Sequence, residues 1–268
     1  MIATKFYLPS ETQTFYFPPT LTSSSTPDTR PLPREWSSWP IIPTVSARAL
    51  EIYHQGQLMG VTPNRFSVVG DCQSVPAVFM GIYGTDRNPI GANFPELLET
   101  IARFYISFNH DSVAVRDGLS APSVLDPLWA DKERCNATES PLACELRLYK
   151  PMIVFVNLGT NWRADASADA YEGYLRKIVA QIIGSGAVPI LTNKADNIEG
   201  ENRINLATAK VAYDYDIPLM NFWMTASSLP NHGLEQDNIY LTPAAWDVRN
   251  SAALRTLDSV WRDLMDKK

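Results

Sequence analysis

The sequence predicts a three-layer α/β domain in which helices cover both faces of a parallel sheet of about five strands, flavodoxin-like in character. Two observations lead to this prediction. Short apolar runs alternate along the chain with longer segments whose apolar residues recur at helical spacing. The run at 152–158 is almost entirely apolar, as in strands that are buried on both faces. Because crossovers between parallel strands must pass over a face of the sheet, the alternation places helices on both faces.

The composition is that of an ordinary globular protein and disfavours several classes of partner. The chain has 268 residues, of which 45% are hydrophobic and 19% charged, enough for one large domain with a well-buried core. A net charge of -6 without a Lys/Arg cluster argues against nucleic acid. No apolar run is long enough for a transmembrane segment, and residues 2–17 lack a signal-peptide pattern.

The first 34 residues differ in composition from the rest. They are rich in Thr, Ser and Pro, and 20–34 can neither form a helix nor bury a core. We expect a flexible or polyproline-like tether at 1–34, followed by the folded domain at 35–268. Such tethers often hold a domain off a cell surface. A frayed terminus is the alternative.

Strands are predicted where the apolar runs are short. They span 66–69, 112–115, 152–158, 188–192 and 217–222.

Helices are predicted where apolar residues repeat at helical spacing. The clearest spans 171–183 and is stopped by Gly184 and Gly186. The last begins at about Pro243, a residue suited to a first helical turn. The predicted helices are 44–53, 75–83, 94–105, 171–183, 204–215 and 243–265.

The three cysteines indicate one disulfide and one unpaired thiol. Cys135 and Cys144 flank a short polar segment, which fits a disulfide-closed surface loop and leaves Cys72 unpaired. Closing so short a loop would stabilise the protein by about 2–3 kcal/mol. It would also indicate an oxidising compartment, extracellular or at the cell surface. Two unrelated free thiols are the alternative.

Residues that could carry chemistry stand directly after the predicted strands. Gly70-Asp71-Cys72 follows the first strand, and Asn161 follows the third. The segment 237–240, Asp-Asn-Ile-Tyr, lies in a longer loop after the fifth. Sites in parallel sheets form beyond the carboxyl ends of the strands, so these remote segments are expected to meet at one rim.

These motifs, in this order, resemble the conserved blocks of the SGNH (GDSL-type) hydrolase family over roughly residues 65–264. In that family a Gly-Asp-Ser block supplies a serine nucleophile, and a later Gly block and an Asn supply oxyanion donors. An Asp-x-x-His block supplies the acid and the base of the triad. Here Cys72 stands in the place of the serine, and Tyr240 in the place of the histidine.

Cys72 is the nucleophile that the resemblance implies. A thiolate is a better nucleophile than a neutral hydroxyl. At the start of a helix the dipole would favour the thiolate, whereas the neighbouring Asp71 would oppose it. The alternative is a buried cysteine that acts as a small apolar residue.

The resemblance also implies an oxyanion hole, made from the N–H groups of Cys72 and Ala121 and the side-chain amide of Asn161. Ala121 stands where the family has glycine, in Gly118-Leu-Ser-Ala121. Its N–H donor survives that change unless the position needs a positive φ. An amide donor of this kind contributes on the order of 3–4 kcal/mol to a barrier. The alternative for Asn161 is a turn residue at the end of a strand.

The resemblance offers no histidine at the position of the base. Asp237 would be the surviving acid, but using Tyr240 as base costs about 4 kcal/mol relative to a group poised near neutrality. His232, in the loop before Asp237, could instead form a pair with Cys72. A surface histidine is the alternative. His54 and His110 are expected to point away from the rim.

The predicted function is therefore hydrolysis of an acyl or acetyl ester of a carbohydrate or lipid, so that the substrate is a small molecule or a glycan ester. Metal-binding, dinucleotide and phosphate-loop patterns do not occur, and no cofactor is expected. The alternative is a catalytically inactive relative that binds a glycan or cell-surface ligand in the same cleft. The aromatic residues Trp162, Trp223 and Trp246 would line that cleft or else pack in the core.

Overall fold

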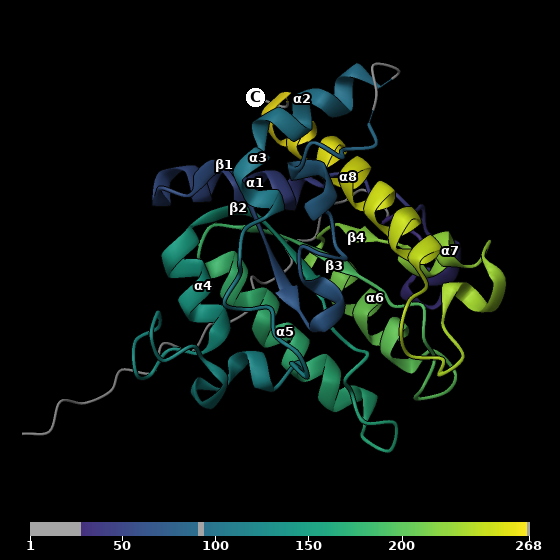
Figure 1. Ribbon diagram of the computed structural model, residues 1–268. Helices are drawn as coiled ribbons and strands as arrows, with labels where there is room; N and C mark the ends of the chain where they lie inside the picture. The colour runs from purple at the N-terminus through teal and green to yellow at the C-terminus, as the bar shows by residue number, and fades with distance from the viewer. Residues whose placement is uncertain (1–27, 91–93, 267–268) are drawn as a thin grey trace, which may run out of the picture. The chain divides into compact units, whose positions relative to one another are not determined.

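The structure is a computed structural model that describes residues 28–90 and 94–266 (Figure 1). Residues from Pro31 onward form one compact unit. The predicted tether, 1–34, lies largely outside the described residues. None of the helices that the described residues form has the length and apolar character needed to cross a membrane.

Four parallel strands form the sheet in the order β1-β2-β3-β4. They are β1 Thr62–Gly70, β2 Pro151–Asn157, β3 Val188–Thr192 and β4 Leu219–Met220. Every residue of β2 and β3 is buried, as the apolar runs predicted. The predicted α/β class with a parallel sheet is thus confirmed.

The predicted strand at 112–115 is wrong as a strand. Only Val115 pairs with the sheet, through a single parallel bridge to Gly70 at the edge of β1 that β2 does not occupy. Side chains take the place of the missing ladder. The Val113 N–H donates to Glu145 Oε2 at 3.0 Å, and Ser112 Oγ donates to the Val68 carbonyl at 2.8 Å. We call the segment 112–115 the vestigial strand. When it is counted beside β1, the strand order of the sheet is that of flavodoxin-like sheets.

The strand predicted at 217–222 is shorter than expected. Asn221 ends it, because its side chain accepts a hydrogen bond from Met224 N at 3.1 Å and caps α7 (Phe222–Ala226). The buried Asn221 amide also donates to the Trp36 and Trp39 carbonyls, at 2.9 and 2.8 Å. The chain therefore turns into a helix where its apolar character alone favoured a strand.

Five of the six predicted helices are present. The segment 75–83 instead forms turns and the short 3-10 helix Gly81–Gly84, because Met80 adopts a φ of 58°. The pattern gave no indication of α4. Besides α7, the helices are α1 Ala47–Met59, α2 Pro95–Arg103, α3 Tyr105–Phe108, α4 Pro141–Tyr149, α5 Ala168–Gly184, α6 Arg203–Tyr215 and α8 Pro243–Asp266.

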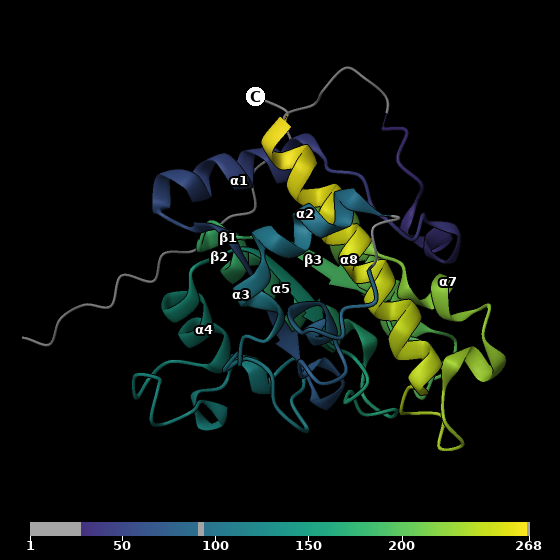
Figure 2. The same cartoon turned by 45° about the horizontal axis from the view of Figure 1, so that its top comes forward.

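The helices cover the sheet as the sequence predicted. α5 and α6 lie side by side on one face, and α8 crosses the other with α2 packed along it (Figures 1 and 2). Trp261 of α8 donates to Thr100 of α2 at 2.7 Å. At the opposite end of the strands from the rim, α1 approaches the turn before β3 so closely that Gly56 packs on Gly186. The carboxyl ends of the strands stay free for a site.

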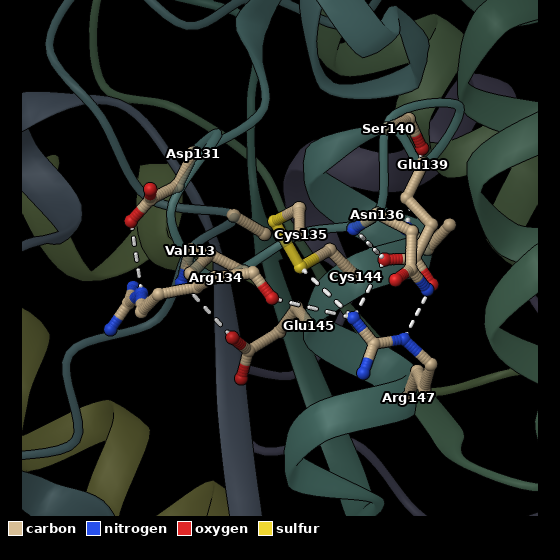
Figure 3. The surroundings of a disulfide bond; sticks show 12 residues. Val113, Asp131, Arg134, Cys135, Asn136, Glu139, Ser140, Cys144, Glu145 and Arg147 are labelled. Atoms are coloured by element: carbon tan, nitrogen blue, oxygen red, sulfur yellow. Dashed lines mark hydrogen bonds and ion pairs between the residues drawn. A yellow bond between two sulfur atoms is a disulfide. The ribbon is translucent and has the colours of Figure 1, made fainter.

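A disulfide joins Cys135 to Cys144 at the start of α4 (Figure 3). Arg147 pairs with Glu139 across the closed loop, and Ser140 caps the helix by accepting from Ala143 N at 3.2 Å. The residue after Cys144 is Glu145, the acceptor that holds the vestigial strand (Figure 3). The disulfide therefore fixes the end of the helix that carries this buried carboxylate.

Candidate functional site

The turn after β1 contacts the loops that follow the bridge and β2. The side-chain amide of Asn161 donates to the Leu119 carbonyl at 3.1 Å and to Asp71 Oδ2 at 3.4 Å. Three segments remote in sequence thus meet at the carboxyl end of the sheet, as the placement after strand ends predicts.

The same turn also contacts the loop that precedes α8. Gln73 Nε2 donates to the Ile239 carbonyl at 3.3 Å, and Gln73 Oε1 accepts from Leu241 N at 2.9 Å. Arg249 of α8 donates through Nη1 to the Gln73 carbonyl at 2.7 Å. The sequence prediction missed both Gln73 and Arg249. The available signal was a charged residue three and four positions before Ala252 and Ala253, on the same face of α8.

Cys72 begins a 3-10 helix of only three residues, Cys72–Ser74. The prediction that a helix dipole favours the Cys72 thiolate is therefore wrong, because a single turn has only a small dipole. Asp71 caps this turn by accepting from Gln73 N at 3.0 Å. The thiol is unpaired and half-buried. Burial and the charges of Asp71 and Asp117 raise the pKa of Cys72 to about 11, so that the thiol is protonated at neutral pH.

Asp117 is the polar neighbour of the thiol that the sequence prediction missed. Its carboxylate acts on Cys72 by charge and as a hydrogen-bond acceptor. Asp117 lies in the loop between the bridge at Val115 and Ala121. Of these, Ala121 already belonged to the predicted site. An acidic residue beside a predicted oxyanion donor was the only signal for it.

Of the predicted oxyanion donors, Asn161 contacts the Cys72 turn through Asp71. No backbone hydrogen bond within residues 28–90 and 94–266 engages the N–H of Cys72 or Ala121. Ala121 is buried and has no positive φ, so alanine fits this backbone. The Asn161 amide is exposed but already donates to two acceptors. It would have to exchange one of them for an oxyanion.

The predicted acid and base make other contacts. Asp237 Oδ1 accepts from Ile239 N at 2.9 Å and Tyr240 N at 3.0 Å, so it shapes its own loop. The Tyr240 side chain is half exposed. The His232 ring packs on Trp223 with centroids 5.1 Å apart. Within the described part of the chain, no hydrogen bond or ion pair joins Cys72 to Asp237, Tyr240 or His232.

The aromatic residues near the rim serve mainly as packing. Trp162, Trp223 and Trp246 are half-buried against the core. Trp223 meets Trp36 edge to face at 5.1 Å, and Trp162 meets Tyr171 in the same way at 5.6 Å. In the part of the chain that the structure describes, His, Cys, Asp and Glu side chains form no cluster of three or more that could hold a metal ion.

No protein-family model and no curated protein matches this chain. Its backbone is similar to several solved structures, all at low sequence identity. A putative acylhydrolase from Bacteroides fragilis is 16% identical and covers 81% of this chain and 99% of its own, with a TM-score of 0.49. A GDSL-like lipase from Bacteroides thetaiotaomicron is 13% identical and covers 80% of this chain and 99% of its own, with a TM-score of 0.47. An acetylxylan esterase from Geobacillus stearothermophilus is 15% identical and covers 72% of this chain and 93% of its own, with a TM-score of 0.46.

Proposed function

We propose that this protein is an SGNH-like hydrolase that cleaves an acyl or acetyl ester of a carbohydrate or lipid at Cys72. One observation carries the proposal. Asp71 accepts a hydrogen bond from the Asn161 amide, and the Gln73 side chain donates to Ile239 and accepts from Leu241, so the Cys72 turn is joined to Asn161 and to the loop at 239–241. The segments that carry the motif residues are therefore held at one turn, which supports a shared site at Cys72.

The proposed chemistry has two halves. The Cys72 thiol first loses its proton to solvent, which costs about 4 kcal/mol at pH 8 for a pKa of about 11. The thiolate then attacks the ester carbonyl, and the alcohol leaves with a proton from water. The N–H groups of Cys72 and Ala121 and the Asn161 amide would bind the oxyanion. Water hydrolyses the resulting thioester, which releases the acid and restores the thiol.

Tyr240 and Asp237 take supporting roles in this scheme. The exposed Tyr240 hydroxyl would donate a hydrogen bond to the departing alcohol oxygen, while Asp237 holds the loop by its two backbone contacts. His232 would act as the base only if the turn at 230–233 released its ring from Trp223. The ionisation step is therefore expected to limit the rate near neutral pH.

A second candidate is a catalytically inactive protein that binds a glycan or a cell-surface ligand at the same rim. The observation that favours it is the raised pKa of Cys72, combined with a resting geometry in which no histidine contacts the thiol. For either function we propose an extracellular or cell-surface location, supported by the Cys135–Cys144 disulfide.

Hydrolysis of p-nitrophenyl acetate and butyrate by the wild type and a Cys72→Ala variant distinguishes the two candidates. The esterase proposal expects release of p-nitrophenol by the wild type, rising with pH, and loss of it in Cys72→Ala. Mass spectrometry of acid-quenched wild type should show one acyl group on Cys72. Equal release by both proteins, without acylation of Cys72, would leave only the binding function.

A further inference from the structure

A small polar cavity lies behind the Cys72 turn, on the side that the thiol does not line. The ends of β2 and β3 and the first turns of α8 enclose it. Its volume is about 30 Å³, room for about two water molecules or an ion of similar size. The charged side chains on its wall are Asp71, Lys194, Asp196 and Arg249, and the amide side chains are Gln73, Asn157 and Asn193.

Arg249 contributes a buried positive charge to this cavity. Its residue is only 6% exposed, and no ion pair within the described ranges includes it. Nη1 donates to the Gln73 carbonyl, but Nε has no partner among the described residues. The rings of Phe79 and Phe222 flank the guanidinium at 4.6 and 5.5 Å. Burial lowers the pKa of Arg249 to about 10, and the charge of Asp71 offsets this only in part.

Asn157, the last residue of β2, contributes a second unsatisfied donor. Its Oδ1 accepts from Thr192 Oγ1 at 2.8 Å, which fixes the amide group. The residue is 6% exposed, and its Nδ2 has no hydrogen-bond partner among the described residues. Buried donors are normally satisfied, so two of them on one cavity indicate an acceptor that binds there.

The acidic residues of the cavity wall are already engaged. Asp196 accepts from Thr160 Oγ1 at 2.8 Å and pairs with Lys194 Nζ. Lys194 also pairs with Glu199 at 2.6 Å. Asp71 accepts from Gln73 N and from the Asn161 amide. Asp71 acts on Arg249 by its charge but forms no ion pair with it among the described residues, so the guanidinium lacks a direct acidic partner, although buried charges in proteins are normally paired.

We propose that this cavity binds one small monovalent anion, a halide or a carboxylate of the size of formate, between Arg249 Nε and Asn157 Nδ2. An ion as large as sulfate does not fit the space of about two waters. Because Arg249 also holds the Gln73 carbonyl, a bound anion stabilises the turn that carries Cys72. The proposal does not depend on ester hydrolysis.

Thermal unfolding at constant ionic strength tests the site. Sodium gluconate, whose anion is too large to enter, is replaced stepwise by chloride, bromide or formate. The site predicts a saturable rise in Tm, about 5–10 °C at a hundredfold excess over Kd. The halide and formate arms show which kind of anion binds. A rise in Tm that is linear in anion concentration, or that sulfate reproduces as well as chloride does, would overturn the proposal.

An Asn157→Asp variant supplies the matched test, because it places a fixed carboxylate beside Arg249. The saturable rise should disappear in this variant. It should persist in Gln57→Glu, which adds the same charge on the exposed end of α1. Crystals of the wild type grown in bromide give a readout that does not depend on the folding of any variant. An anomalous peak between Arg249 and Asn157 is expected, and a cavity containing only water would refute the site.

Discussion

Gln73 holds Leu241, a residue 168 positions later in the chain, by a hydrogen bond of 2.9 Å from the Leu241 N–H to Gln73 Oε1. The same amide donates to the Ile239 carbonyl. The residue next to the candidate nucleophile therefore positions the loop that carries Asp237 and Tyr240. The site is built by side chains that link loops, while the residues expected to react do not touch one another.

Replacement of Gln73 should therefore separate the two halves of the site. Gln73→Leu removes two hydrogen bonds and leaves the Leu241 N–H without its acceptor, so we expect a loss of about 1–3 kcal/mol in the free energy of unfolding. Urea denaturation measures this loss. Gln236→Ala, an exposed change in the same loop, is the control. Equal stability of the two variants would show that Gln73 does not hold the loop.

The reactivity of Cys72 should increase steeply with pH. Its pKa of about 11 lies above the usual value of a thiol, so only about one molecule in a thousand is ionised at pH 8. The rate of alkylation by iodoacetamide should rise about tenfold per pH unit between pH 7 and 10. Because the thiol ionises first in the unfolded chain, stability should also fall as pH rises from about 9 to 11. A rate that levels off near pH 8 would contradict this environment.

Asp117 should account for part of the raised pKa of Cys72. Burial is the largest cause and Asp71 the next, so Asp117→Asn removes the third contribution, the charge of Asp117, and weakens the fourth, its hydrogen bond with the thiol. We expect alkylation at pH 8 to be several-fold faster than in the wild type. Asp86→Asn, an exposed change that does not act on Cys72, should leave the rate unchanged. Equal rates in both variants would remove Asp117 from the site.

The disulfide should stabilise the domain measurably. Cys135 and Cys144 are nine residues apart, and closing such a loop is worth about 2.5 kcal/mol. Urea unfolding of a Cys135→Ala, Cys144→Ala double variant should show a loss of that order. Dithiothreitol should lower the stability of the wild type by a similar amount and leave the double variant unaffected. A wild type that is insensitive to the reductant, with the bond reduced, would refute this contribution.

Glu145 should anchor the vestigial strand. Its buried carboxylate accepts from Ser67 Oγ at 2.6 Å, from Val113 N at 3.0 Å, and contacts His110 Nε2 at 2.7 Å. Glu145→Ala removes these contacts, leaves the buried Val113 N–H without its acceptor and should cost about 2–4 kcal/mol of stability. Hydrogen exchange of the Val113 amide should also accelerate. The exposed change Glu133→Ala serves as control, and protection of Val113 that survives Glu145→Ala would contradict the assignment.

The local pattern of the chain was sufficient for most of the fold. The mostly apolar runs at β2 and β3 and the periodic repeats of α5, α6 and α8 required no tertiary information, because the spacing of apolar residues predicts which of them are buried. The placement of the motifs after strand ends also predicted that the segments at 70–72, 161 and 237–240 would meet, and hydrogen bonds join Asp71 to Asn161 and Gln73 to Ile239.

Tertiary structure decided where strands end and which segments fail to become strands, because side chains accept hydrogen bonds from backbone N–H groups at these places. Glu145 accepts the Val113 N–H and leaves a single bridge where a strand was predicted, and Asn221 ends β4 early. The environment of Cys72 also depends on a side chain that is remote in sequence. The sequence determined that a thiol follows the first strand, but only the fold places Asp117 beside it. That proximity, together with burial, sets the charge state on which any reaction at Cys72 depends.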